Sequence, residues 1–261
     1  MLDQITPVIL TRDEEANIAR TLTQLQWANE VVVVDSLSTD RTIEIATRFP
    51  NVRIVQRAFD SLTAQWTFAL TQVPTPWLLA LDADYFLPDD FIAEIAKLDP
   101  PPNVRAYRAE FVYAVHGKRL RASLYPPRIV LLHRDHMSYW QDGHTHRMRV
   151  DGDVGDLRAK VIHDDRKTLR RFIQRQRDYM RLEAGKIRNT KWRDLNVAGK
   201  IRKLIVVAPF AVLLHTLFGR RLILDGWPGL VYTFERVLAE VILSWELFRS
   251  AAAKPPLSHP R

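Results

Sequence analysis

Apolar runs alternate with amphipathic stretches through the first 85 residues of the chain. Continuous apolar runs are typical of strands buried on both faces, and we expect strands at 5–10, 31–35, 52–56 and 77–81. Between these strands, apolar residues recur at helical spacing within 18–25, 41–49 and 64–70. This alternation predicts an α/β fold with a mostly parallel central sheet and right-handed crossovers.

After residue 100 the pattern changes. Apolar and polar residues alternate from 104 to 115 and lead to His116-Gly117-Lys118, which predicts a β-hairpin, and 128–133 predicts another strand. Amphipathic or apolar helices are expected at 168–187, 204–218 and 230–248. We therefore expect one domain over 1–165 and a helical extension, basic and apolar, over 166–261.

The segment 204–218 is almost entirely apolar, and as a helix its 15 residues span only ~22 Å. A bilayer core is ~30 Å thick, and Pro209 is expected to kink the helix, so the segment should not span a membrane. An element lying in one leaflet fits better, flanked by Lys200, Arg202, Lys203, Arg220 and Arg221. The competing interpretations are a buried core helix and a homo-oligomer interface formed with 230–248.

Charge is distributed unevenly along the chain, whose net charge is +8. Residues 1–150 hold 16 basic and 18 acidic side chains, whereas 151–261 hold 22 and 12. A basic C-terminal part suggests an anionic partner, either a membrane surface with anionic lipids or a nucleic acid. Aromatic residues are sparse in the basic segment 166–203 and no RNA-binding or zinc motif is present, so the membrane is favoured.

The chain has no cysteine, which excludes disulfides and thiolate chemistry. The N-terminal residues lack a basic region followed by a long apolar stretch, so we expect no secretory signal. Together with the basic half, this predicts a cytoplasmic protein, peripheral on the inner face of the plasma membrane.

Three carboxylates come at the ends of predicted strands. Asp35 ends the second strand, and Asp82 and Asp84 end the fourth. Because the carboxyl ends of parallel strands form one edge of the sheet, we expect the three to converge on one ligand-binding crevice, where Asp82 and Asp84 share Mg²⁺ or Mn²⁺ with a substrate phosphate. The alternative is that they form turn hydrogen bonds or cap helices, but the next helix has its own start signal at 88–90.

Several motifs together resemble family 2 glycosyltransferases, which have the GT-A nucleotide-diphospho-sugar fold and invert the anomeric centre. These are PVILT at 7–11, EEANI at 14–18, VVVVDSLSTD at 31–40 and LDAD at 81–84. Further motifs resemble a bacterial subgroup that includes lipopolysaccharide-core β-1,4-glucosyltransferases. They are Trp27-Ala28, FPNV at 49–52, RAFD at 57–60, Gln65, DGHT at 142–145, HDDRK at 163–167 and DGW at 225–227.

The resemblance implies a role for each matching residue. Thr11 and Glu14 would border the nucleotide and Asp35 would bond the base, while Asp82 would contact the ribose or the metal. Asp84 would hold the metal that bridges the diphosphate. Residues 1–100 would then bind the nucleotide sugar, with Arg57 and Gln65 among the binding residues, and 101–165 would form the acceptor half.

The segment HDDRK at 163–167 would close over the diphosphate in the resembling family. His163 would ligate the metal or bond a phosphate, and Arg166 or Lys167 would neutralise the leaving group. The alternative is a helix N-terminus with Asp164 and Asp165 as caps.

The expected catalytic base is Asp142, because inverting transfer needs one base to take the proton of the acceptor hydroxyl. Many relatives have a glutamate directly after a histidine here, where this chain has His144-Thr145. The alternative is a turn with surface histidines.

Three departures from the family pattern concern the recognition of base and sugar. Leu37 stands where glycine is common, Tyr85 stands where an acidic residue is frequent, and Arg12-Asp13 replaces an aromatic-asparagine pair.

The sequence as a whole predicts an inverting, metal-dependent hexosyltransferase. It would transfer a hexose from a nucleotide-diphosphate sugar such as UDP-glucose to a lipid-linked or lipopolysaccharide-core acceptor. The alternatives are a nucleic-acid-binding protein using 166–203 and a sugar nucleotidyltransferase. A sugar nucleotidyltransferase requires a glycine-rich phosphate-binding loop near the N-terminus. The first strand of this chain ends in Thr11-Arg12-Asp13 instead, which disfavours that alternative.

Overall fold

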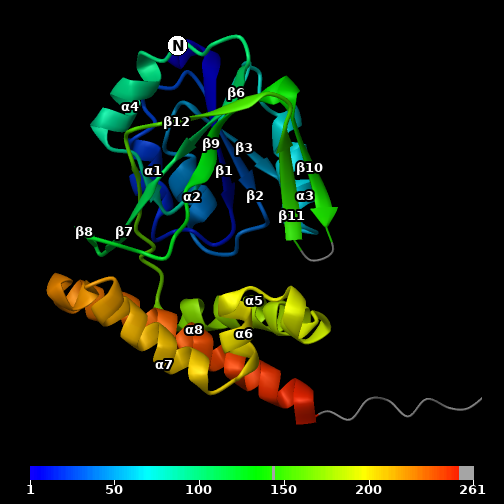
Figure 1. Cartoon of the computed structure of the whole chain (residues 1–261). Helices are drawn as coiled ribbons and strands as arrows, with labels where there is room; N and C mark the ends of the chain where they lie inside the picture. Colours follow the sequence, from blue (N-terminus) through cyan, green and yellow to red (C-terminus); the bar gives the residue numbers. More distant parts are fainter. Residues whose placement is uncertain (143–144, 253–261) are drawn as a thin grey trace, which may run out of the picture. The chain divides into compact units, whose positions relative to one another are not determined.

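The computed structural model describes residues 1–142 and 145–252, shown in Figure 1. Contacts between Cα atoms divide the chain into two compact units. The first unit comprises Met1–Arg119 and Leu124–Arg166, and the second comprises Leu120–Ser123 and the chain from Lys167 onward. The two units are described separately below.

The first unit is built on a seven-stranded sheet with the order β12-β6-β9-β4-β1-β2-β3. Its strands in chain order are β1 (Ile5–Thr11), β2 (Val31–Asp35), β3 (Val52–Gln56), β4 (Trp77–Asp82), β6 (Val104–Ala109), β9 (Arg128–His133) and β12 (Asp153–Asp156). The four strands β4, β1, β2 and β3 are parallel, whereas β9 runs antiparallel to β4 and β6. The mixed α/β class with a mostly parallel sheet is therefore confirmed.

Helices and a hairpin cover both faces of this sheet. One core cluster joins the sheet to α1 (Ile18–Thr23), α2 (Thr42–Ala46) and α4 (Asp89–Ala96). The other joins it to α3 (Leu62–Thr71) and to the hairpin of β10 (Met137–Asp142) and β11 (Thr145–Val150). The four valines of β2 are fully buried because they face both clusters, and each such burial contributes roughly 1.5–3 kcal/mol.

A smaller sheet has the order β5-β13-β7-β8 and carries part of the site. Its strands are β5 (Tyr85–Phe86), β7 (Phe111–Val115), β8 (Lys118–Arg119) and β13 (Val161–His163). The hairpin predicted over 104–118 is shorter than expected. Only β7 and β8 pair across His116 and Gly117, which both have positive φ as a two-residue hairpin loop requires, while β6 joins the large sheet.

Leu37 follows β2 with a φ of 58°, in the left-handed region, and is exposed. A Cβ atom is crowded in this conformation, which glycine adopts without strain. This gives a physical reason why glycine is common at the position in the resembling family.

The second unit is helical. It contains α5 (Leu169–Asn189), α6 (Val197–Lys203), α7 (Val207–Leu214), a π-helical turn (His215–Gly219) and α8 (Trp227–Ala252). Short 3-10 turns lie at Leu2–Gln4 and Arg134–His136 in the first unit and at Trp192–Asp194 and Leu222–Asp225 in the second. The core between α5 and α8 includes Ala184, Ile187, Leu243 and Leu247.

The single kinked helix expected over 204–218 is not formed. Ile205 has a φ of 59°, which separates α6 from α7, and α7 begins at Val207. Pro209 therefore lies in the first turn, where its missing N–H group has no intrahelical acceptor to lose. The expected kink at Pro209 is wrong for this reason. In the described part of the chain, no helix combines the length and the apolarity needed to cross a membrane.

Candidate functional site

The register of the parallel strands decides which strand-end residues meet. Thr11 of β1 lies beside Asp35 of β2, and Leu10 lies beside Asp82 of β4. Asp35 and Asp82 thus end at the same edge of the sheet, as predicted. However, they are offset by one position, and side chains alternate between faces, so the two carboxylates point to opposite faces. The register thus places Asp35 and Asp82 on opposite faces at one edge of the sheet, and the expected convergence of Asp35, Asp82 and Asp84 on one crevice stays a prediction.

Asp35 is fully buried and is held by donors of its own chain. Its Oδ1 accepts from the hydroxyl of Thr11 at 2.9 Å and from the hydroxyl of Ser38, and its Oδ2 accepts from the backbone N of Ser38 at 2.8 Å. Gln56 donates to Oδ2 from β3 at 3.3 Å. Asp35 therefore ties together the ends of β1, β2 and β3, and its assignment to the nucleotide base stays a prediction.

Arg57 and Gln65 lie together next to this cluster. The guanidinium of Arg57 donates to Oε1 of Gln65 and forms a two-pronged ion pair with Asp60, at 3.0 and 2.7 Å. Buried Gln65 donates in turn to the hydroxyl of Ser36 at 2.8 Å. The hydrogen bonds from Arg57 and from the Ser61 backbone lower the pKa of Asp60 to about 2.

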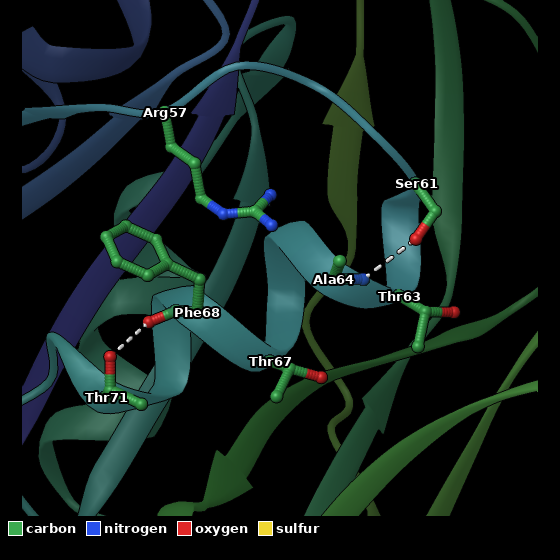
Figure 2. A pocket seen from close by; sticks show the side chains of 7 residues that line it. All are labelled: Arg57, Ser61, Thr63, Ala64, Thr67, Phe68 and Thr71. Carbon is green, nitrogen blue, oxygen red and sulfur yellow. Dashed lines mark hydrogen bonds between the residues drawn. The ribbon is translucent and has the colours of Figure 1, made fainter.

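An open hollow of about 580 Å³ lies along α3 beside Arg57. Figure 2 shows the side chains that line it, namely Arg57, Ser61, Thr63, Ala64, Thr67, Phe68 and Thr71. Its volume is in the range of small-molecule sites, but Arg57 is its only member among the predicted site residues, and neither Asp82 nor Asp84 lines it. The chemistry therefore points to the carboxylates rather than to this hollow as the reaction centre.

Asp84 and His163 form the centre of the second cluster. Asp84 follows β4 and is buried, and its Oδ2 lies 3.1 Å from Nε2 of His163 in β13. Burial lowers the pKa of His163, but the negative charge of Asp84 and its hydrogen bond outweigh this, so that the pKa lies above its usual value. The imidazole is enclosed by the rings of Tyr85, Tyr113 and Tyr125, whose centroids lie 5.5, 4.9 and 4.7 Å away.

Asp82 is half-buried and sits close to this pair. Burial raises its pKa, the charge of Asp84 raises it further, and a hydrogen bond from Tyr85 opposes the rise. The Tyr85 hydroxyl lies 2.6 Å from that of Tyr125, whose pKa is raised to about 12 mainly by burial. Tyr85 thus replaces the frequent acidic residue with a neutral phenol that contacts Asp82.

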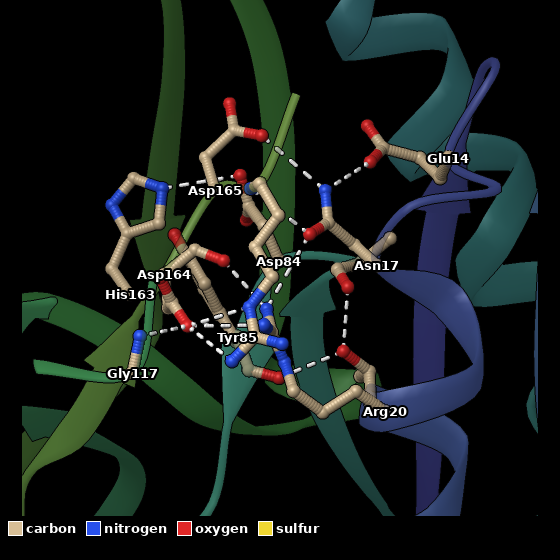
Figure 3. Close-up of polar contacts among 12 residues, drawn as sticks. Glu14, Asn17, Arg20, Asp84, Tyr85, Gly117, His163, Asp164 and Asp165 are labelled. Atoms are coloured by element: carbon tan, nitrogen blue, oxygen red, sulfur yellow. Dashed lines mark hydrogen bonds and ion pairs between the residues drawn. The ribbon is translucent and has the colours of Figure 1, made fainter. Parts of the chain in front are cut away.

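Asp164, which sequence reasoning named only as a helix cap, is the most connected residue of the cluster. It is buried, and its Oδ2 accepts hydrogen bonds at 3.0 Å each from Arg20, from Arg166 and from the backbone N of Gly117 (Figure 3). Its backbone N donates to the carbonyl of Asp84 at 3.1 Å. Asp164 therefore joins α1, the β7–β8 turn and the end of β13 around Asp84.

The interpretation of Asp164 and Asp165 as helix caps is wrong. The side chain of Thr168 caps α5 by accepting from the backbone N of Arg171. Asp165 accepts instead from the side chain of Asn17, which also donates to Glu14 at 3.1 Å (Figure 3). Asn17 is fully buried although Glu14, Glu15 and Arg20 lie close to it in the sequence, so no local pattern indicated its burial.

The residues around Asp84 fit a divalent cation in part. Among the described residues, no group of three or more His, Asp and Glu side chains is arranged to hold a metal ion. The predicted ligands Asp82, Asp84 and His163 therefore do not form a preassembled set. Mg²⁺ is commonly held by one or two carboxylates together with substrate phosphates, and Mn²⁺ prefers the same oxygen ligands. Asp84 with His163, whose buried Nδ1 has no hydrogen-bond partner in the described part, fits a site that the substrate completes.

Two predicted residues are not placed by this geometry. Asp142 ends β10, but its side chain lies outside the described residues, as does residue 144. Lys167 belongs to the helical unit and not to the first unit, which holds the other residues of the cluster. Their predicted roles stay predictions.

The family model of Glycosyl transferase family 2 matches residues 7–119, which include β1 to β8, Asp35, Asp82 and Asp84. The match covers 113 of the 261 residues and shows similarity to family 2 glycosyltransferases over this part of the chain. The resemblance stated from the motifs is thereby confirmed, and the matched part includes the strand edge that carries the carboxylates.

Curated relatives match part of this chain over part of their own length. An "Uncharacterized glycosyltransferase" of Rickettsia felis is 28% identical over 135 residues, which cover 51% of this chain and 42% of the relative. The lipopolysaccharide core biosynthesis glycosyltransferase LpsC of Rhizobium meliloti is 30% identical over 84 residues, or 31% of each chain. The matches thus span about two fifths or less of the length of these relatives.

Among solved structures, a mannosyltransferase from Pyrobaculum calidifontis, in complex with GDP-Man and Mn²⁺, has a similar fold. The TM-score is 0.50 at 16% identity, and the match covers 95% of this chain and 86% of that one. At this identity the likeness concerns the fold, which is that of a GT-A glycosyltransferase.

Proposed function

We propose that this protein is an inverting, metal-dependent glycosyltransferase that uses a nucleotide-diphosphate sugar as donor. The observation that carries the proposal is the placement of Asp82, Asp84 and His163. They come together beside the carboxyl end of β4, within or next to the part of the chain that matches family 2. Open α/β sheets bind their ligands at this edge.

Different residues of the chain would bind the metal, bind the nucleotide, remove the acceptor proton and stabilise the leaving group. Asp84 and His163 would hold Mg²⁺ or Mn²⁺, which when bound neutralises charge on the diphosphate. Thr11, Glu14 and Asp35 would shape the nucleotide site, with Arg57 and Gln65 bracing its outer side. Asp142 would take the proton from the acceptor hydroxyl while the nucleoside diphosphate leaves from the opposite face of the sugar. Arg166 and Lys167 would offset charge on the leaving group.

A hexose donor and a lipid-linked or lipopolysaccharide-core acceptor are the substrates we propose. The support is the sequence similarity to LpsC and the subgroup motifs at 142–145 and 163–167. A UDP-linked donor such as UDP-glucose is the first to test.

The test is a screen of the purified full chain against UDP-, GDP- and dTDP-sugars, with Mn²⁺, with Mg²⁺ and with EDTA. We expect nucleoside diphosphate release from one donor class, lost on chelation and restored by metal. Release of pyrophosphate would indicate a nucleotidyltransferase instead. No turnover of any donor with a lipid-linked or core oligosaccharide acceptor present would contradict the proposal.

We further propose that the helical unit, whose main stretch begins at Lys167, binds an anionic membrane surface. Helix α8 has two apolar faces: one packs on α5, and the other is exposed. Six large residues of the exposed face, 45–59% accessible, fall within about 60° of the helix circumference over ~30 Å. They are Trp227, Leu230, Phe234, Val241, Trp245 and Phe248. Such a stripe beside many basic side chains is typical of an interfacial helix.

Replacing Phe234 and Trp245 together by glutamine should weaken binding to vesicles of phosphatidylcholine and phosphatidylglycerol at least 10-fold, since each buried aromatic contributes ~1.5–3 kcal/mol. Vesicle co-sedimentation measures the effect. The matched control is Trp192→Gln, which removes an equally exposed tryptophan outside α8. Unchanged sedimentation of the double variant would contradict the proposal that this stripe binds membranes. Loss of a dimer on gel filtration, with unchanged sedimentation, would show that the stripe is an oligomer interface instead. Salt-sensitive binding to DNA or RNA but not to vesicles would favour the nucleic-acid alternative.

A further inference from the structure

Arg128 is a cation beside the carboxylates that the sequence motifs did not single out. It is the first residue of β9, which runs antiparallel to β4 with Leu131 beside Leu79. The pairing of β4 with β9 ends at Leu79 and Leu131, and Arg128 lies close enough to Asp82 for its charge to act on that carboxylate. Burial raises the pKa values of Asp82, Tyr85 and Tyr125, and the positive charge of Arg128 opposes this rise in each of them.

The guanidinium of Arg128 is held in a defined place although the residue is exposed. Its Cζ lies 4.7 Å from the ring centroid of Tyr125, a cation–π contact. Tyr125 is itself anchored by the Tyr85 hydroxyl at 2.6 Å and by the imidazole of His163 at 4.7 Å between ring centroids. The cation is therefore fixed to the same aromatic group that encloses the Asp84–His163 pair.

Charge balance indicates what this cation is for. Two carboxylates offset one divalent cation, so the negative charge of a bound diphosphate remains uncompensated. Arg166 shares buried Asp164 with Arg20, so part of its positive charge is already offset and a further cation at the diphosphate would add to its effect. The planar fork of an arginine suits phosphate oxygens better than a point charge does.

We propose that Arg128 binds the diphosphate group of the nucleotide donor, with Tyr125 as the platform that positions its guanidinium. This assignment rests on the proposed function, because it presupposes a nucleoside diphosphate at the Asp82–Asp84 edge. It identifies Arg128 as a donor-binding residue and Tyr125 as a positioning residue.

The experiment compares the binding of UDP with UMP, and of GDP with GMP, to the full chain in Mn²⁺ by isothermal titration calorimetry. Arg128→Gln should weaken diphosphate binding roughly 10- to 100-fold and leave monophosphate binding within about 3-fold, since a charge-assisted hydrogen bond is lost only at the β-phosphate. Arg128→Lys should lie between the two, because it keeps the charge but loses the fork. Tyr125→Phe keeps the ring and should weaken diphosphate binding only slightly, through the lost contact with the Tyr85 hydroxyl. Tyr125→Ala removes the ring and should weaken diphosphate binding more than Tyr125→Phe but less than Arg128→Gln.

Arg158→Gln is the matched control, an exposed arginine on the loop before β13, and should leave all four affinities unchanged. Thermal unfolding of each variant shows that the fold is retained. Equal diphosphate affinity of wild type and Arg128→Gln overturns the assignment and leaves the proposed function standing. A wild-type chain that binds none of the nucleotides overturns both. An equal loss for monophosphates and diphosphates overturns the diphosphate assignment alone.

Discussion

Replacing Asp84 by asparagine should reduce glycosyl transfer by about 10³-fold, equivalent to ~4 kcal/mol of transition-state stabilisation. Asparagine keeps the shape of the side chain and removes the charge that, in the proposed function, would bind the cation. The neighbouring Asp82 has a pKa raised by burial and then by the charge of Asp84, so the substitution also relieves repulsion between the two carboxylates. The weakened contact with His163 opposes this gain, so stability should change little while activity is lost.

Initial rates of nucleoside diphosphate release, Mn²⁺ affinity by electron paramagnetic resonance and thermal unfolding together test this prediction. The control is Asp89→Asn at the N-terminus of α4, where an exposed carboxylate five residues away is neutralised without touching the cluster. Activity and metal affinity at wild-type levels in the Asp84 variant would remove the main support for the proposed function. Loss of activity with a large fall in unfolding temperature would show that Asp84 acts on the fold instead.

Replacing Asp164 by alanine should destabilise the first unit by about 3–5 kcal/mol, the usual effect of removing one partner of a buried ion pair. Asp164 is only 2% exposed and Arg20 has a side chain 19% exposed, so water cannot replace the lost partner. Burial already lowers the pKa of Arg20, an effect that Asp164 opposes, and the variant leaves this cation without its nearest counter-charge. The substitution also frees Arg166 and the backbone N of Gly117.

Chemical denaturation of Asp164→Ala, Arg20→Met and the double variant measures the coupling between the two residues. We expect the double variant to be more stable than the sum of the single losses predicts. Asp156→Ala breaks an exposed pair with Arg108 and serves as the control, with an expected loss below about 1 kcal/mol. A loss equally small for Asp164→Ala would mean that the segment 163–166 is held by other contacts.

The strands and the long helices of this protein are largely readable from the sequence. Continuous apolar runs predicted β1, β2 and β4, and helical spacing predicted α5 and α8 to within a few residues at most ends. The helix boundaries that were predicted wrongly lie at two places. At Ile205 the backbone adopts the left-handed conformation, and Pro209 lies in the first turn of a helix. Neither depends on hydrophobic periodicity.

The sequence by itself determined the sheet, the helical second unit and the carboxylates at the strand ends, because each depends on the order of residues a few positions apart. Only the tertiary structure decided how those residues meet. A one-residue offset between strands turned Asp35 away from Asp82, and contacts across 144 and 79 residues brought Arg20 to Asp164 and His163 to Asp84. Register and long-range packing fix such contacts, and no local pattern of polar and apolar residues encodes them.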